Sequence, residues 1–223
     1  MSAQTAEDRV RVVLRPIGSP LPLGFLGLFV ATTGFSAVQL GWIPADQGAV
    51  VALGVLVFTV PVQLLASALG FLARDPVAGT GMGVLAGTWA AAGLTTLRAE
   101  PGSHSPGLGI LLLASAAAML VPAAAASGKL LAAAVMALSA LRFACTGVVQ
   151  LTGSADWTRL AGWTGVVLGA LALYAALAFE LEDVHGRSVL PVLRRAQGAA
   201  AMQGDVERQL DGLPHEAGVR LQL

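Results

Sequence analysis

The chain has 223 residues, 56% of them hydrophobic and 12% charged, against roughly 25% charged residues in an ordinary soluble domain. Its mean hydropathy of +0.75 excludes a water-soluble globular fold. The 13 basic side chains balance the 13 acidic ones, which indicates no nucleic-acid partner, and a single cysteine and three scattered histidines predict no disulfide, metal site or cofactor.

Residues 1–18 are predicted to form a cytoplasmic N-terminal segment. They carry Arg9, Arg11 and Arg15 together with two acidic residues, and they contain no apolar core ahead of a cleavage site. A secretory signal peptide needs such a core, so we do not expect this segment to be one.

Six apolar stretches follow, each long enough to cross a bilayer, because a transmembrane helix needs about 20 mostly apolar residues. Short polar or Gly/Pro-rich breaks separate them. They cover 22–42, 48–73, 77–97, 107–126, 130–153 and 160–181. This pattern predicts an all-α integral membrane protein with six transmembrane helices in a compact bundle.

The distribution of Lys and Arg predicts how the bundle is oriented. Six spans place both chain ends on one side of the membrane, and that side carries most of the basic residues. The other side carries only Arg98 and Arg159. Because basic residues accumulate on the cytoplasmic side, both termini are predicted to be cytoplasmic in a multi-pass protein of the cell membrane.

Glycines at helical spacing predict two packing faces. Gly79, Gly83 and Gly87 recur every fourth residue in the third span, and Gly165 and Gly169 do so in the sixth. Small residues let transmembrane helices approach closely, which supplies their van der Waals contact. The alternative is that a Gly/Ala-rich composition produces such spacings by chance.

Uncharged polar side chains share one helical face in each of the first two spans. They could line a water-filled path or hydrogen-bond to neighbouring helices, and the spacing alone does not separate these interpretations. Pro61 removes a backbone donor inside the second span and predicts a kink or local unwinding there. The residues are Thr32, Ser36 and Gln39 in the first span and Thr59, Gln63 and Ser67 in the second.

Arg142 is the deepest charge of the predicted spans. It lies about 18 Å along the fifth helix, near mid-membrane, where an arginine costs about 2.5–3.5 kcal/mol and usually faces a bundle interior or water. Ser139, Thr146 and Gln150 share its face. Arg142 is interpreted either as an anion-attracting residue beside a conduction path or as a structural arginine bonded to helix-end carbonyls or to Glu180.

The acidic residues lie near helix ends or in loops, so no span offers a carboxylate for a proton relay. If protons move with a weak acid, the simplest route is on the carboxyl group of the substrate itself. No span carries a nucleophile, metalloprotease or paired-aspartate motif, so the chain is not predicted to be an enzyme.

Two segments resemble a known family. The stretch 19–24, Ser-Pro-Leu-Pro-Leu-Gly, resembles the Asn-Pro-x-Pro-Leu-Gly signature of the acetate uptake transporter family, with Ser19 in place of asparagine. At the other end, the stretch 186–191, Gly-Arg-Ser-Val-Leu-Pro, resembles the closing signature of that family. Gln63 and Trp89 match an amide and an aromatic residue between them. The resemblance covers 19–191, which we take as the transporter domain.

This resemblance implies six-helix subunits assembled as hexamers, each with its own path for acetate or similar small carboxylates moved with protons. It also implies that Pro20 and Pro22 border the path. Relatives narrow the path with large residues, typically Phe, Tyr and Leu, at positions that correspond here to Leu28, Leu85 and Ser139. The smaller residues here, together with Arg142, predict a path that is wider or that attracts anions more strongly, and that would admit larger carboxylates.

Residues 192–223 form a predicted cytoplasmic C-terminal tail. Met202, Val206, Leu210 and Leu213 could line one face of a short helix at the membrane surface. Disorder is the alternative, because short interrupted helices are marginal in water.

The predicted function is a membrane transporter or channel for acetate or similar small monocarboxylates or dicarboxylates such as succinate, with protons, in a homo-oligomer in the lipid bilayer. The alternatives are a channel for urea, short amides or ammonia, and a non-transporting scaffold subunit. The predicted substrate path comprises Pro20, Pro22, Leu28, Thr32, Ser36, Gln39, Gln63, Leu85, Ser139, Arg142 and Thr146.

Overall fold

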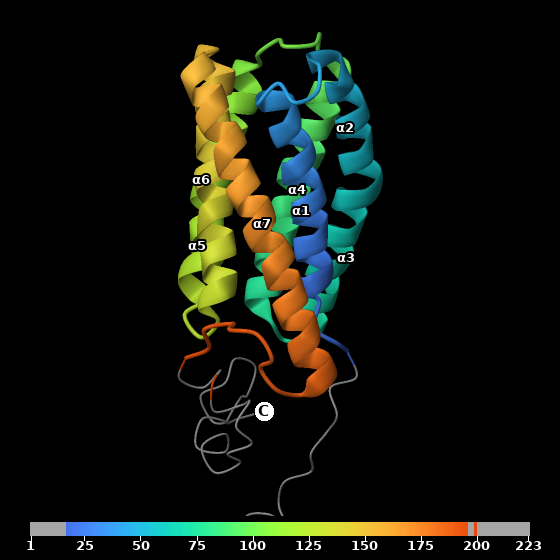
Figure 1. Cartoon of the computed structure of the whole chain (residues 1–223), viewed down its shortest axis with the longest axis vertical. Helices are drawn as coiled ribbons and strands as arrows, with labels where there is room; N and C mark the ends of the chain where they lie inside the picture. Colours follow the sequence, from blue (N-terminus) through green and yellow to red (C-terminus); the bar gives the residue numbers. More distant parts are fainter. Residues whose placement is uncertain (1–16, 196–198, 200–223) are drawn as a thin grey trace, which may run out of the picture.

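The computed structural model of the chain describes residues 17–195 and residue 199. Six helical stretches in it are long and apolar enough to cross a membrane, which confirms the predicted all-α fold of a multi-pass membrane protein (Figure 1). The elements are α1 (Leu21–Gln39), η2 (Ala45–Gln47), α2 (Gly48–Gly54), η3 (Val55–Thr59), α3 (Val60–Leu72), α4 (Pro76–Arg98), α5 (Pro106–Ala125), α6 (Leu130–Thr152) and α7 (Ala155–His185).

The second span is a single long helix with a widened turn in its middle. Between α2 and α3 lies η3, a five-residue π-helical segment, and Pro61 follows it in the first turn of α3. A proline lacks the backbone N–H that would close the preceding α-helical turn, so this segment is the local unwinding that Pro61 predicts. The turn places the Thr59 hydroxyl against α1, where it donates to the Gly27 carbonyl at 3.0 Å.

The sixth span differs most from its predicted bounds. The apolar stretch covers 160–181, whereas α7 runs from Ala155 to His185. At its start the Ser154 hydroxyl accepts a hydrogen bond from the Trp157 amide at 3.5 Å. At its end Gly186 has φ +61°, a left-handed conformation that glycine adopts without strain. Because backbone hydrogen bonding continues beyond the apolar core, the helix extends through polar turns that hydropathy does not count.

The two ends of the bundle differ in what they carry. At one end, which we call the termini end, lie the first described residues, the turns 73–75 and 126–129, and the segment after α7 (Figure 1). The opposite end, the loop end, carries the connections 40–47, 99–105 and 153–154. The helices α1, α4 and α6 all run from the termini end to the loop end. Both described chain ends therefore leave the bundle on the same side.

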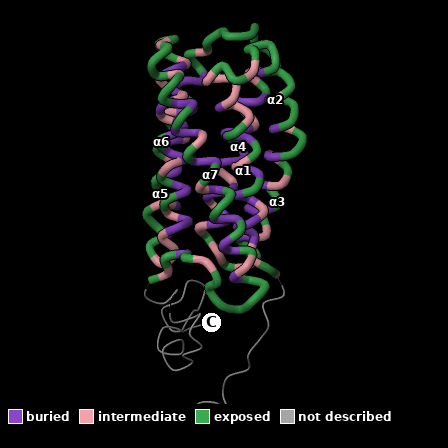
Figure 2. The backbone as a smooth tube through the Cα atoms, in the orientation of Figure 1, coloured by how far each residue is buried: buried purple, intermediate pink, exposed green. Residues whose placement is uncertain are grey.

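The helices pack mainly as the pairs α5–α6, α1–α7 and α3–α4, and buried residues gather along the centre of the bundle (Figure 2). Gly79 packs on α3, since a Cβ there would lie 2.7 Å from the Phe71 ring, and Gly83 faces Ser67. Gly87 is exposed, and a Cβ added to it would meet nothing within 4 Å. The predicted glycine face of this helix therefore packs within the chain at two residues, whereas Gly87 meets no other helix in the described part of the chain.

The segment 186–195 folds back under the bundle at the termini end. The Leu130 and Arg195 amides donate to the Leu193 and Gly128 carbonyls at 3.3 and 3.1 Å, which joins the segment to the α5–α6 turn. Arg194 forms an ion pair with Glu182 of α7, with Nε 2.9 Å from Oε2. The start of the predicted tail is thus held against the bundle, whereas the predicted helix around Met202 and the arginines before residue 17 lie outside the described residues.

Candidate functional site

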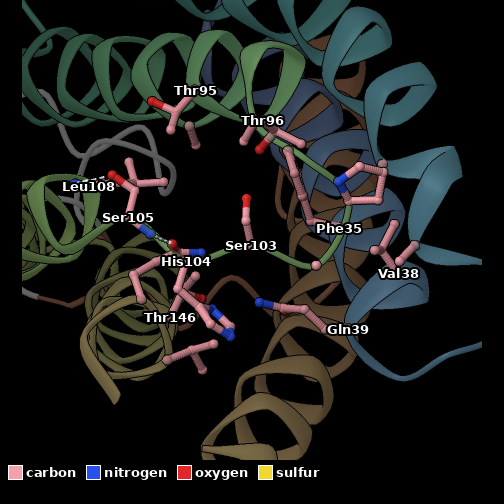
Figure 3. A pocket seen from close by; sticks show the side chains of 18 of the residues that line it. Phe35, Val38, Gln39, Thr95, Thr96, Ser103, His104, Ser105, Leu108 and Thr146 are labelled. Atoms are coloured by element: carbon pink, nitrogen blue, oxygen red, sulfur yellow. Dashed lines mark hydrogen bonds between the residues drawn. The ribbon is translucent and has the colours of Figure 1, made fainter. Parts of the chain in front are cut away.

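A cavity of about 370 Å³ lies at the loop end of the bundle. Its wall is formed mainly by side chains of α1, α4 and α6 and by the 99–105 connection, as Figure 3 shows for Phe35, Thr95 and Thr146, and the segment 45–49, α5 and α7 add further residues. Pockets for small ligands commonly have volumes of about 300–1,000 Å³. The cavity therefore has the size of a ligand site, and it reaches from the surface of the loop end to Arg142 inside the bundle.

Arg142 forms the inner end of this cavity. Its side chain is 2% exposed, and its Nη1 donates to the Ala161 carbonyl of α7 and, at 3.3 Å, to the Thr146 hydroxyl. Among residues 17–195, no ion pair includes Arg142. The bond to a helix carbonyl agrees with one predicted alternative, and the predicted partner Glu180 is not used. The guanidinium is thus anchored by one nitrogen and carries no counter-charge.

Gly165 of α7 makes room for this guanidinium. A Cβ at Gly165 would lie 2.7 Å from Arg142 Nε and closer still to the Ser36 hydroxyl. The Thr32 hydroxyl donates to the Gly165 carbonyl at 3.3 Å. The predicted packing glycine therefore has a second role, since it lets α1, α6 and α7 meet around the Arg142 side chain.

Three aromatic rings from three helices lie beside Arg142 in the cavity wall. Phe35 of α1 stacks on Trp89 of α4, with ring centroids 5.7 Å apart, and Phe143 of α6 meets Trp89 edge-on at 5.6 Å. Trp89 is 4% exposed, and its Nε1 has no hydrogen-bond partner in the described part of the chain. We call these three residues the aromatic floor.

Sequence reasoning missed Phe35 and Phe143 as site residues and noted Trp89 only through the family resemblance. The signal was present, since Phe143 follows the deepest charge and Phe35 precedes Ser36 on a polar face. An aromatic residue inside an apolar span has no distinctive periodicity, however, so only the folded structure shows which ones meet.

Polar groups line the cavity above the aromatic floor. Gln39 lies in the wall (Figure 3), and its Oε1 is buried without a hydrogen-bond partner among the described residues. Gln150 Oε1 accepts from the Ser105 amide at 2.7 Å, which ties the 99–105 connection to α6. Glu100 and His104 lie nearer the opening. The site thus has Glu100 and His104 at its mouth, and Arg142 and the aromatic floor at its inner end.

Leu28, Leu85 and Ser139 lie on the other side of the aromatic floor, toward the termini end. Each is 0% exposed. They precede the floor residues of the same helices by about one or two turns. The Ser139 hydroxyl donates to the Val135 carbonyl of its own helix at 2.8 Å, so it presents no free donor. The three positions that the resemblance assigns to a narrowing are therefore closed to solvent in this structure.

The remaining predicted path residues lie outside the cavity wall. Pro20 and Pro22 are buried where α1 begins, at the termini end. Gln63 Nε2 donates to the Gly24 carbonyl at 3.2 Å, and the Ser67 hydroxyl donates to the Gly79 carbonyl at 2.7 Å. In the second span the polar face thus joins helices at their glycines, and of the predicted residues the cavity brings together Gln39, Arg142 and Thr146.

Comparisons of the sequence with known proteins find matches over short segments. No family model matches the chain. A segment of 56 residues, 25% of the chain, is 41% identical to an uncharacterized protein of Methanothermobacter thermautotrophicus, and a segment of 50 residues, 22% of the chain, is 38% identical to the succinate-acetate/proton symporter SatP of Escherichia coli K12. Each segment covers only 27% of the length of that relative.

The similarity in structure extends much further than the similarity in sequence. The solved structure of the bacterial acetate channel SatP matches this chain with a TM-score of 0.70 and 21% sequence identity, over 79% of this chain and 99% of the channel chain. The six helices therefore have the fold of that channel. The resemblance to the acetate uptake transporter family that the sequence predicts is confirmed.

Proposed function

We propose that this protein is a channel or transporter that moves acetate or a similar small carboxylate across a membrane. The observation that carries this proposal is the arginine without a counter-charge, among the described residues, at the inner end of the cavity, in a bundle with the fold of an acetate channel. A planar guanidinium matches a carboxylate in geometry as well as in charge. Burial strengthens that attraction, because the surrounding dielectric constant is low.

The substrate enters from the loop end and pairs with Arg142. Thr146 steadies the guanidinium, and the Trp89 Nε1–H is a further donor without an acceptor in the described part of the chain. Passage then requires the layer of Leu28, Leu85 and Ser139 to separate. The proposed path is therefore a cavity with an anion site and a single apolar barrier toward the termini end.

Proton movement, assembly and orientation belong to the same proposal. The carboxylates of residues 17–195 lie near helix ends or in connections, so a proton would cross on the substrate as its neutral acid. The termini end carries Arg74, Lys129, Arg187, Arg194 and Arg195, which supports cytoplasmic termini in a cell membrane. From the family resemblance we also propose a hexamer and succinate as a further substrate. From the sequence we propose an N-terminal segment, a six-helix bundle and a C-terminal tail.

The test is flux into liposomes that contain the purified full chain and a pH-sensitive dye. Gradients of acetate, succinate, lactate, urea and ammonium are applied in turn, with protein-free vesicles as the baseline. We expect carboxylate-dependent flux that Arg142→Gln lowers by about 100-fold, because a desolvated ion pair with the substrate is lost. Arg98→Gln is the matched control, since Arg98 is exposed and lies outside the cavity wall.

Other outcomes separate the alternatives. Because urea carries no proton, its movement is followed by vesicle swelling. Urea or ammonia flux without carboxylate flux would replace the proposal with a channel for neutral nitrogen solutes. If the folded protein gave no flux of any of these solutes, a scaffold subunit would be favoured. Equal loss of flux in Arg142→Gln and Arg98→Gln would show that the guanidinium at the cavity end has no special role.

A further inference from the structure

The inner end of the cavity combines one cation with an apolar surface of aromatic rings. Arg142 has no counter-charge among the described residues, and the aromatic floor of Phe35, Trp89 and Phe143 lies beside it. Acetate would use the cation but would offer the rings only a methyl group. The cavity wall, which also includes Val38, Leu108 and Leu112, therefore has more apolar surface than acetate can cover.

Resting on the proposed function, we infer that the cavity prefers a monocarboxylate with a ring-sized apolar body, such as an arylacetate, over acetate and over dicarboxylates. Its carboxylate pairs with Arg142, and its body packs against the aromatic floor. Aromatic groups pack well at centroid distances of about 4.5–7 Å, either offset or edge-on. Phe35, which stacks on Trp89, is the half-buried ring of the floor that a ligand body would contact.

The size of the cavity supports a larger ligand. Its volume of about 370 Å³ lies within the range of pockets that enclose molecules of several functional groups. Of the three floor rings, Phe35 is the half-buried one that faces the cavity, while Trp89 and Phe143, 4% and 2% exposed, pack behind it and hold it in place. A ring-sized body would replace water against this wall, which is favourable in proportion to the apolar area covered.

The charges around the cavity argue against a second carboxylate. Among the described residues, Arg142 is the one cationic side chain at the inner end, and the groups nearer the mouth include the acidic Asp46 and Glu100. A dicarboxylate bound to Arg142 would place its second charge against the aromatic floor or toward these acids. Both positions are unfavourable, because a buried charge needs a partner and like charges repel.

The experiment is calorimetric titration of the full chain in lipid nanodiscs at pH 7 and constant ionic strength. The ligands are phenylacetate, acetate, succinate and the neutral isostere 2-phenylacetamide. We expect phenylacetate to bind at least about tenfold more tightly than acetate, succinate and the amide, a difference of about 1.4 kcal/mol. The comparison uses the wild-type chain, so it does not depend on any variant folding.

Two ring deletions then test the floor itself. Phe35→Leu and Phe143→Leu keep an apolar side chain and remove a ring, and each should lower the phenylacetate-to-acetate affinity ratio by about two- to tenfold. The matched control is Phe58→Leu, since Phe58 is 45% exposed and lies outside the cavity wall. Its ratio should stay at the wild-type value.

The results separate this inference from the proposed function. Acetate binding equal to or tighter than phenylacetate binding would overturn the inference and leave the carboxylate proposal standing. Tight binding of 2-phenylacetamide would show that the rings act without Arg142 and would overturn it as well. Absence of binding by every carboxylate, with absence of flux in liposomes, would overturn both.

Discussion

The two halves of the bundle treat their polar side chains in opposite ways. Toward the termini end, the Ser67 hydroxyl donates to a helix carbonyl, Lys129 pairs with Asp75, and Arg194 pairs with Glu182. Toward the loop end, the Gln39 and Trp89 side chains hold buried atoms without partners, and Arg142 has no counter-charge, as far as the structure describes the chain. The termini-end half pairs most of its polar groups within the bundle, whereas the loop-end half also leaves several of them unpaired, among the described residues, beside a cavity.

This contrast shows where a ligand would gain most. A buried polar group without a partner costs free energy, so groups left unpaired beside a cavity favour a ligand that pairs with them. Gln63 is the exception in the termini-end half, because its Nε2 is bonded while its Oε1 has no partner among residues 17–195. The contrast predicts that substitutions of polar residues in the termini-end half lower stability, and that those in the loop-end half change binding or flux.

The largest effect on stability is expected from Arg194→Ala at the termini end. It leaves the Glu182 carboxylate, whose side chain is 5% exposed, without its ion-pair partner, at a cost of about 3–5 kcal/mol. The thermal unfolding midpoint in nanodiscs measures this loss. Arg159→Ala is the control, since its pair with Asp156 is 75% and 94% exposed and is worth about 0–1 kcal/mol. Equal losses in the two variants would contradict the contrast.

Leu85→Ala tests the layer of Leu28, Leu85 and Ser139 between the two halves. Removing this side chain, which is 0% exposed, should cost about 2–5 kcal/mol in stability, because a cavity replaces close-packed atoms. It should also raise carboxylate flux per folded protein, since the barrier below the aromatic floor is thinner. Leu64→Ala, at a position 54% exposed, is the control for both measurements. Unchanged flux in Leu85→Ala would place the barrier elsewhere.

Gly165→Ala tests whether the position of the Arg142 side chain depends on the space left by this glycine. The substitution should lower the free energy of unfolding by about 1–3 kcal/mol. The added Cβ would lie 2.7 Å from Arg142 Nε, so the guanidinium must shift from its present position. Carboxylate flux per folded protein should fall by about tenfold, since substrate binding depends on the placement of that charge. Gly87→Ala adds the same methyl group where nothing lies within 4 Å and should leave flux at the wild-type level.

The smallest effect is expected from Gln150→Leu at the mouth of the cavity. It removes the acceptor of the Ser105 amide, a hydrogen bond of 2.7 Å worth about 0.5–1.5 kcal/mol. Hydrogen exchange of the Ser105 amide should become about tenfold faster, while exchange in α6 stays unchanged. Thr152→Val is the control, because that hydroxyl donates to a carbonyl of its own helix. Equal acceleration in the control would remove the assigned role of Gln150.

Much of the fold could be predicted from the sequence. The spans end within a few residues of their predicted positions except for α7, whose polar end turns carry no hydropathy signal. Pro61 predicted the widened turn at η3, and the depth of Arg142 followed from the rise of a helix. The sequence does not decide whether the polar face of the second span lines a path or bonds to neighbouring helices. The structure shows the second arrangement, with hydrogen bonds to the carbonyls of Gly24, Gly27 and Gly79.

Six membrane-spanning helices and one deep arginine can be predicted from the sequence, because the hydropathy of a span and the rise along a helix depend only on neighbouring residues. Which helical faces meet is visible only in the folded bundle. The aromatic floor joins residues 35, 89 and 143 from three separate helices, and Gly165 on a fourth helix, α7, makes room for Arg142. Successive side chains on a helix point about 100° apart. The rotation of one helix about its axis, relative to its neighbours, therefore decides whether a side chain joins helices or lines the cavity.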